Sequence, residues 1–262
     1  MGRALDPPFG AHTLLRATRR APLTRLLFRD DAYLRTCNSR VTKVDARGIG
    51  LDATVFYASS GGQPGDTGKL RLENGSVIQI VDTIRGDGPD DVIHVPGPGS
   101  PAVQPGMAIQ AEIDWERRYR HMRLHTCMHL LCAAVPYSVT GGQIAADRAR
   151  LDFDTQGNTL DREAVTTRLN ELVASGAPVS ARWITDAELA ANPQLVRTMS
   201  VNPPTGQGRV RLLDVSGIDL QPCGGTHVRN TLEIGRVAIL KIESKGRQNR
   251  RVVVGFAGEG GK

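Results

Sequence analysis

Aromatic residues are scarce in this sequence of 262 residues, at 4% of the total. Proteins that hold a single strand of nucleic acid on a row of stacked bases need exposed aromatic rings, so the composition argues against such a platform. No run of about eighteen apolar residues occurs, and we expect neither a membrane span nor a membrane partner. The four cysteines lack the spacing of a secreted disulfide framework, which predicts reduced thiols in a cytosol-like compartment.

Basic residues are in excess, with 33 Lys and Arg against 27 Asp and Glu and a net charge of +6. This excess suits an anionic partner such as a nucleic acid. Because aromatic rings are few, we expect contact with a phosphate backbone or with a nucleic-acid end. The sequence does not specify an oligomeric state.

The N-terminal segment, residues 1–24, is rich in arginine and contains a single acidic residue, Asp6. It lacks the continuous apolar core of a secretory signal. We interpret it as a disordered extension or as the result of a start codon placed too early. An Arg-rich, acid-poor start is also typical of an organelle transit peptide. We therefore expect a cytoplasmic protein, with a mitochondrial location as the alternative.

The next part of the chain, residues 25–113, alternates short apolar runs with turns rich in glycine and proline. Several short strands with such turns predict a small β-barrel or sandwich, which we assign as the first domain. The strands are expected at 41–44, 50–57, 77–81 and 92–95.

The pattern changes at Asp114, which can cap the N-terminus of a helix that runs to about Val135. A second helix is expected to begin near Asp161, and a third follows the capping-box sequence at Thr185. Strand-like segments end at 149–153 and return at 210–215, 237–242 and 252–254. Because these elements do not follow a regular βαβ order, we predict an α+β domain over 114–258.

Two pairs of metal-binding residue types stand far apart in the chain. His125 and His129 are four residues apart on the first expected helix, so both imidazoles can face one ion. Cys223 and His227 flank the sequence Gly-Gly-Thr, in which the glycines allow the backbone to approach a ligand closely. Three imidazoles and one thiolate suit tetrahedral zinc, so we predict one Zn²⁺ per chain.

Competing interpretations of this motif remain. His121 lies one turn before His125, and Cys132 projects between the two histidine directions, so either could replace a member of the set. A zinc protease is disfavoured, because its motif needs glutamate directly after the first histidine and this chain has Thr126.

A glycine-rich segment, residues 54–68, can approach a phosphate or sugar backbone closely, or can form a tight hairpin of the barrel. It lacks the Lys-Ser/Thr ending of a nucleotide-binding P-loop, so ATP binding is not expected. A basic cluster at 245–251 either contacts a polyanion or is an ordinary solvated face.

The sequence His125-Thr-Cys-Met-His129-Leu-Leu, together with Cys223-Gly-Gly-Thr-His227, resembles the editing domain of alanyl-tRNA synthetases and the free-standing AlaX alanyl-tRNA editing proteins. The glycine-rich segment resembles the corresponding motif of the longer AlaX forms. The resemblance covers roughly residues 25–255. The chain departs from it at Cys127 and Ser60, where the family usually has Ala and often has Gly, respectively.

The resemblance implies a translation-factor-like barrel followed by the α+β editing domain shared with threonyl-tRNA synthetase. It implies a hydrolase that removes a wrong amino acid, chiefly serine with glycine as a second candidate, from misacylated alanine tRNA. It nominates Thr140, with Gln143 as a weaker neighbour, as the residues that sense the serine hydroxyl. We also nominate residues for contact with tRNA: Gly61, Gly62, Gln63, Asp66, Lys245 and Arg250.

Two mechanisms stay open for the zinc site formed by His125, His129, Cys223 and His227. A zinc-bound water could attack the ester, or the ion could orient the aminoacyl group and polarise its carbonyl. Four protein ligands would leave little room for water unless the coordination expands. A non-catalytic, zinc-stabilised tRNA-binding module is the alternative, and editing of threonyl-tRNA synthetase products is a second enzymatic rival.

Overall fold

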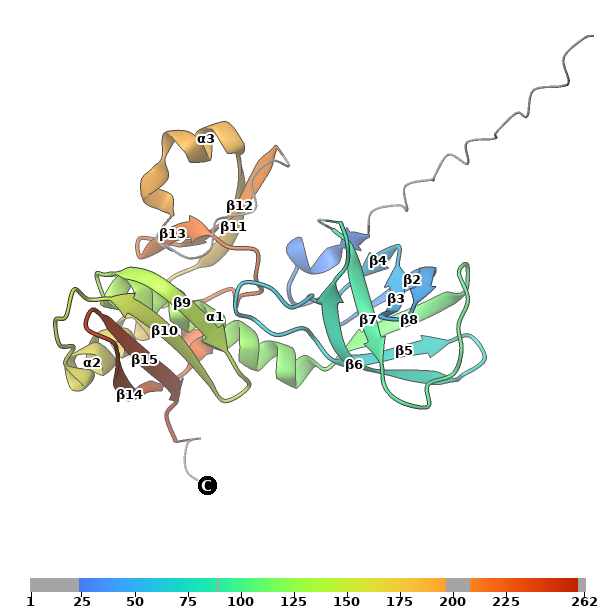
Figure 1. Ribbon diagram of the computed structural model, residues 1–262, viewed down its shortest axis with the longest axis horizontal. Coiled ribbons are helices and arrows are strands. Elements are labelled where there is room, and N and C mark those ends of the chain that lie inside the picture. The colour runs from blue at the N-terminus through green and yellow to red at the C-terminus, as the bar shows by residue number, and fades with distance from the viewer. Residues whose placement is uncertain (1–23, 89, 197–207, 259–262) are drawn as a thin grey trace, which may run out of the picture.

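The computed structural model describes residues 24–88, 90–196 and 208–258. A closed six-stranded barrel lies at one end and an α+β lobe at the other, and helix α1 (Trp115–Ala134) runs between them (Figure 1). The Arg-rich segment before Thr24 lies outside the described residues. No helix in the described ranges is long and apolar enough to cross a membrane.

The barrel is built from antiparallel pairs in the closed order β2-β3-β7-β6-β5-β8. Inward-facing aliphatic side chains such as Leu51, Leu70 and Ile78 are fully buried and fill it. The strands expected at 77–81 and 92–95 are confirmed, and the structure is a barrel and not a sandwich. Its strands are β2 (Thr36–Asp45), β3 (Gly48–Leu51), β5 (Gly68–Leu72), β6 (Val77–Arg85), β7 (Val92–Pro96) and β8 (Ala108–Ile113). A short parallel pair, β1 (Arg25–Leu26) with β4 (Ala53–Thr54), lies beside the barrel.

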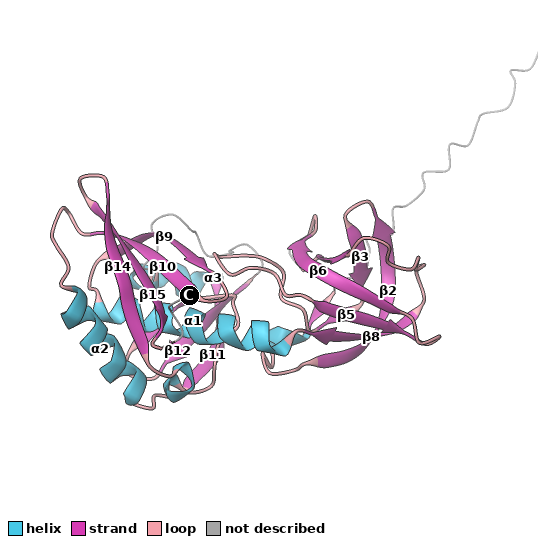
Figure 2. Ribbon diagram, turned by 90° about the horizontal axis from the view of Figure 1, so that it is seen from below, coloured by secondary structure: helices cyan, strands magenta, loops and turns pink. Residues whose placement is uncertain are grey.

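The α+β lobe contains a four-stranded antiparallel sheet in the order β14-β15-β10-β9. Its strands are β9 (Ser138–Ile144), β10 (Arg148–Asp154), β14 (Val237–Lys245) and β15 (Asn249–Phe256). Helices α1 and α2 (Arg162–Ala174) cover one face of this sheet (Figure 2). The core between them contains buried side chains from both layers, including Leu130, Phe153, Leu169 and Val252. This arrangement confirms the α+β class.

Local sequence signals account for where the helices begin. Asp114 accepts a hydrogen bond from the Arg117 amide at the start of α1, and Asp161 caps α2 in the same way. Thr185 and Glu188 form the capping box predicted for the third helix, α3 (Asp186–Ala191). The three predicted helices are therefore confirmed.

A third, smaller sheet carries α3 and stands apart from the other two (Figure 1). Its antiparallel strands follow the order β11 (Val179–Thr185), β12 (Arg209–Val215) and β13 (Asp219–Pro222). The segment after β13 returns to α1, which places the second half of the predicted metal motif beside the first half.

Candidate metal centre

The four predicted ligands come together in one buried cluster. His125 and His129 lie on adjacent turns of α1, while Cys223 and His227 lie on the segment that follows β13. The four donor atoms all lie within 4.8 Å of one another. The three histidines are buried, and Cys223 is partly exposed toward a cavity. The alternatives His121 and Cys132 are not members of this cluster.

Electrostatics within the cluster favour a thiolate. The Cys223 Sγ atom lies 3.2 Å from Nε2 of His227 and 3.5 Å from Nε2 of His125. Burial disfavours ionisation of the thiol, but the charges and hydrogen bonds of the neighbouring histidines hold the pKa of Cys223 well below its usual value. Thiolate is the form in which cysteine binds metal.

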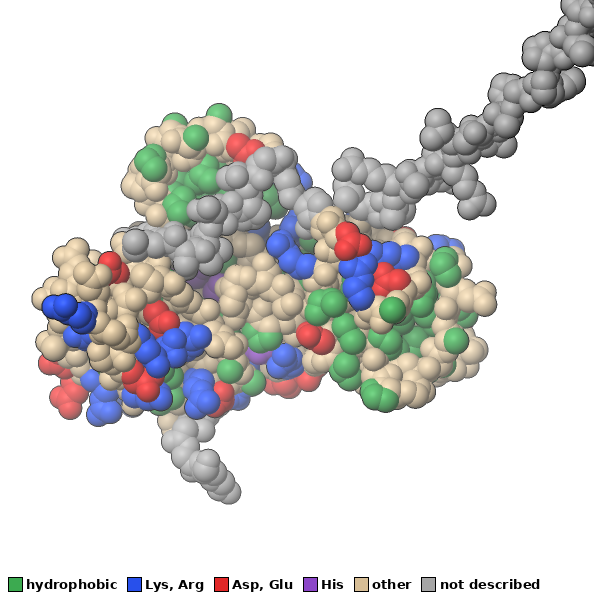
Figure 3. Space-filling view, viewed as in Figure 1, with side chains coloured by type: hydrophobic (Ala, Val, Ile, Leu, Met, Phe, Trp, Pro, Cys, Tyr) green, Lys and Arg blue, Asp and Glu red, His purple; other side chains and the backbone are tan. Residues whose placement is uncertain are grey.

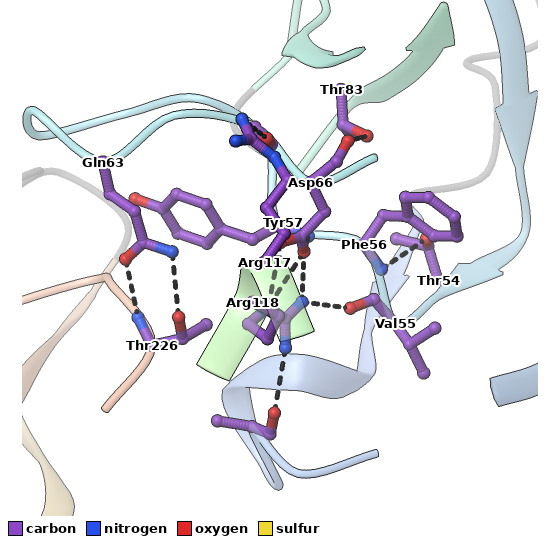
Figure 4. A network of polar contacts seen from close by, with 12 residues as sticks. Thr54, Val55, Phe56, Tyr57, Gln63, Asp66, Thr83, Arg117, Arg118 and Thr226 are labelled. Carbon is purple, nitrogen blue, oxygen red and sulfur yellow. Dashed lines mark hydrogen bonds and ion pairs between the residues drawn. The ribbon is translucent and has the colours of Figure 1, made fainter. Parts of the chain in front are cut away.

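The barrel supplies the group that orients His125. Gln63, from the glycine-rich segment, accepts a hydrogen bond from His125 Nδ1 at 2.9 Å through its side-chain oxygen. The same oxygen accepts the Thr226 amide at 3.1 Å, and the Gln63 amide group donates to the Thr226 hydroxyl at 2.9 Å (Figure 4). With Nδ1 engaged, Nε2 of His125 is left for a metal.

The other two histidines are oriented from within the α+β lobe. His129 Nδ1 donates to Asp219 Oδ2 at 2.8 Å, and His227 Nδ1 donates to the Thr126 hydroxyl at 3.3 Å. Burial opposes the charge on His129, but the hydrogen bonds to Asp219 and Cys223 raise its pKa to about 9. Burial, followed by the charge of His125, holds the pKa of His227 well below its ordinary value.

These contacts show that the residues fit a zinc ion. All three Nδ1 atoms are held by outer partners, and the remaining donors are three imidazole Nε2 atoms and one thiolate. A metal-bound histidine typically donates its other ring N–H to such a partner. The donor set is therefore suited to tetrahedral zinc in both chemistry and orientation.

Two glycines are required by close approaches around the cluster. A Cβ atom on Gly225 would lie 2.2 Å from the His125 ring, so only glycine fits there. Gly62 has a φ of 83°, and a Cβ atom on it would lie 2.7 Å from the Gly142 carbonyl oxygen on β9. The tip of the glycine-rich segment is a tight hairpin turn, because Ser60 and Gln63 exchange backbone hydrogen bonds across Gly61 and Gly62. This turn packs on β9 of the α+β lobe.

A buried ion pair fixes this segment to the start of α1. Arg118 donates to both carboxylate oxygens of Asp66, and neither side chain is exposed to solvent (Figure 4). Arg118 also donates to the carbonyl oxygens of Ala32 and Val55, while Asp66 accepts the Tyr57 amide. The barrel and the helix that carries the histidines are thus joined by one fully hydrogen-bonded contact.

A cavity of about 500 Å³ opens beside the cluster. Its walls come from the glycine-rich segment, from α1, from β9 and from the small sheet β11-β12-β13. Such a volume lies in the range of ordinary small-molecule sites. In the space-filling view, Lys and Arg side chains lie on both lobes around their junction (Figure 3).

The predicted substrate-sensing residues lie next to this cavity but are not among its lining residues. Thr140 donates a hydrogen bond to the Asp152 carbonyl oxygen at 3.1 Å. Gln143 is exposed and accepts hydrogen bonds from Arg150. On β9 the lining is formed by Val139, Gly141 and Gly142. The assignment of Thr140 and Gln143 stays a prediction.

The residues predicted to contact tRNA lie in different environments. Gly61 and Gly62 line the cavity, whereas Gln63 and Asp66 are buried and engaged inside the protein. Two further candidates lie on the hairpin of β14 and β15, outside the cavity lining: Lys245 and Arg250. A tRNA contact stays a prediction for all six residues.

Sequence reasoning did not assign the outer partners of the histidines. Asp219 stands four residues before Cys223, so its proximity to a ligand was a usable signal. Thr126 was considered only as the residue that argues against a protease. For Gln63 no local signal exists, because 62 residues separate it from His125.

Family models match two parts of the chain. Residues 210–253 match the second additional domain of threonyl and alanyl tRNA synthetases. Residues 29–117, which include the barrel, match the class II (A) tRNA synthetases.

Whole-chain relatives agree with these matches. The chain is 34% identical to the alanyl-tRNA editing protein AlaX-M of Methanosarcina acetivorans, over 88% of this chain and 98% of the relative. It is also 34% identical to AlaX-M of Saccharolobus solfataricus, with the same coverage. An alanine–tRNA ligase of Pyrobaculum calidifontis is 35% identical over 85% of this chain, which spans 25% of that longer protein. The chain belongs to the family of alanyl-tRNA editing proteins.

Proposed function

We propose that this protein hydrolyses the ester of mischarged alanine tRNA, chiefly seryl-tRNA, at a zinc ion held by His125, His129, Cys223 and His227. The observation that carries the proposal is the set of four oriented donors at the wall of a cavity lined by both lobes. Glycyl-tRNA is the second candidate substrate. The names of the relatives support tRNA editing as the activity.

The need for such an activity follows from the limited selectivity with which a synthetase can bind a small amino acid. A synthetase pocket for alanine cannot reject every small side chain by the factor that translation requires, so a second site must remove the errors. A zinc ion in this place would supply a Lewis acid for the ester hydrolysis. The residues of the chain orient the ligands through Gln63, Asp219 and Thr126, and shape the cavity that receives the aminoacyl group.

We propose that the tRNA approaches along the glycine-rich segment, where Gly61 and Gly62 line the cavity. The basic residues Lys245 and Arg250 would contact the backbone farther from the cavity. This proposal is supported by the net positive charge of the chain.

The first test is turnover. We expect catalytic amounts of the zinc-loaded protein to remove serine from alanine tRNA that is mischarged with serine, and to leave alanyl-tRNA intact. A zinc chelator should stop the reaction. The measurement is the loss of radiolabelled amino acid with time. Binding of tRNA without loss of either amino acid would contradict the proposal and would favour the non-catalytic, zinc-stabilised module.

Selectivity can be tested at Thr140. If its hydroxyl senses serine, Thr140→Val should reduce the preference for seryl-tRNA over alanyl-tRNA by about fivefold, the loss expected for one hydrogen bond of about 1 kcal/mol. Thr140→Ser keeps the hydroxyl and serves as the control. An unchanged preference in Thr140→Val would remove this residue from the selectivity mechanism and turn attention to the polar groups that line the cavity.

A further inference from the structure

One face of the small sheet extends from the metal cluster toward the cavity rim. Trp183 on β11 is paired with Arg211 on β12, so their side chains lie on the same face of the sheet. Arg209 is two residues before Arg211 and therefore shares that face. All three residues line the cavity that also contains His125 and Cys223.

Arg211 connects this face to the metal cluster. Its Nη1 atom donates to the carbonyl oxygens of Cys223 and Gly225, at 2.9 and 3.1 Å. Its Nε atom is buried and has no hydrogen-bond partner in the described part of the chain. A buried N–H without a partner is costly, and a ligand atom in the cavity would satisfy it.

Trp183 forms the outer part of the same face. Trp183 is 40% exposed, although tryptophan is highly buried on average in folded proteins. The Arg209 guanidinium lies 4.5 Å from the centroid of the ring. Because the guanidinium lies over one face of the indole ring, a nucleobase in the cavity would stack on the other face.

The charge of the cavity also favours a nucleotide. Four arginines line it: Arg29, Arg85, Arg209 and Arg211. Its one acidic lining residue, Asp91, forms an ion pair with Lys43 at 2.6 Å. Arg29 is also paired, with Asp90 at 2.7 Å, so the positive charge of the lining rests mainly on the other three arginines. Such a lining suits phosphate groups.

We infer that Trp183, Arg209 and Arg211 form a subsite for the terminal adenosine of the tRNA, in which the base stacks on the indole ring and the arginines contact the adjoining phosphates. The inference rests on the proposed function, because the ester to be cleaved joins the amino acid to the ribose of that same nucleotide. Scarcity of aromatic residues argues against a long platform, but one ring suffices for one base.

The subsite can be tested by binding alone. The RNA trinucleotide CCA, which copies the tRNA end, is titrated onto the zinc-loaded protein while tryptophan fluorescence is recorded. Of the two tryptophans, Trp115 is stacked on Tyr119 and covered by Arg35, so we expect saturable quenching to come from Trp183. Quenching should be lost in Trp183→Phe and weak for a trinucleotide with an abasic 3′ end. Equal quenching in Trp183→Phe would overturn the subsite.

Deacylation kinetics provide the second readout. Loss of one base–aromatic stack predicts that Trp183→Ala raises KM for seryl-tRNA by about 10- to 100-fold, with kcat close to that of the unchanged protein. Trp183→Phe should restore most of the affinity, because a phenyl ring still stacks. Leu240→Ala is the matched control: this side chain is also 40% exposed, but it lies on β14 outside the cavity lining.

The two proposals fail in different ways. Unchanged KM for seryl-tRNA in Trp183→Ala, with the protein still active, would overturn the subsite and leave the deacylase intact. Absence of turnover by the unchanged protein would overturn the proposed function, and the CCA titration would then decide on the subsite by itself.

Discussion

Cys223→Ala is expected to lose both zinc and deacylase turnover. Cys223 is the only thiolate donor of the cluster, and its Sγ atom lies within 3.5 Å of two of the imidazole donors. Removing even an outer partner of a metal ligand typically costs 10- to 100-fold in affinity, so the loss of a direct ligand should exceed about 100-fold. The cluster would retain three imidazole donors and no thiolate donor.

Measurement of the metal content shows whether Cys223→Ala loses activity because zinc binding is lost. Zinc is measured after dialysis, and cobalt substitution is followed by the visible absorption that a thiolate ligand produces. Cys37→Ala is the control, because Cys37 lies on the barrel strand β2 and is not part of the cluster. A Cys223→Ala protein that retains one zinc per chain and full activity would refute the ligand assignment.

Asp66→Ala is expected to destabilise the protein by about 3–5 kcal/mol, because it leaves the buried Arg118 guanidinium without its counter-charge. Arg118 would keep only its hydrogen bonds to the Ala32 and Val55 carbonyl oxygens. Since Gln63 lies three residues earlier on the same segment, we also expect weaker zinc binding. The measurements are the midpoint of urea unfolding and a competitive zinc titration.

A double variant tests whether the unpaired charge of Arg118 causes the loss of stability in Asp66→Ala. Replacing both partners, as in Asp66→Leu with Arg118→Met, removes the uncompensated charge and should recover part of the stability that Asp66→Ala loses. Glu171→Gln is the control: its partner is Arg168 on the same helix, and both side chains are 57% exposed, so little change is expected. Equal unfolding midpoints for Asp66→Ala and Glu171→Gln would show that the buried pair does not hold the interface.

Features encoded within a few residues were predictable from the sequence. The N-caps at Asp114, Asp161 and Thr185 depend on hydrogen bonds to amides two or three residues away, so the helix starts were predicted correctly. The histidine pair on α1 and the Cys223–His227 pair each follow from a four-residue spacing. That the two pairs meet could be inferred from chemistry, because together they complete one tetrahedral set.

Features that depend on distant pairings were not predictable in the same way. Closure of the barrel requires β8 to pair with both β2 and β5. Strands β5 and β8 were not foreseen, although Asn74-Gly75 follows the first and Pro105-Gly106 precedes the second. A tight hairpin turn was one expectation for the glycine-rich segment, but the packing of that turn on β9 could not be foreseen. The same limit applies to the role of Gln63, since its partners lie in another part of the chain.

The contact of Gln63 with both His125 and Thr226 also bears on how the protein is made. Gln63 and Thr226 are 163 residues apart, and during synthesis the N-terminal parts of a chain generally fold first. The barrel and its glycine-rich segment can therefore be in place while the final two predicted ligands, Cys223 and His227, are still on the ribosome. Metal capture would then be one of the last events in maturation, and a chain interrupted before Cys223 would carry a folded barrel and half of the predicted ligand set.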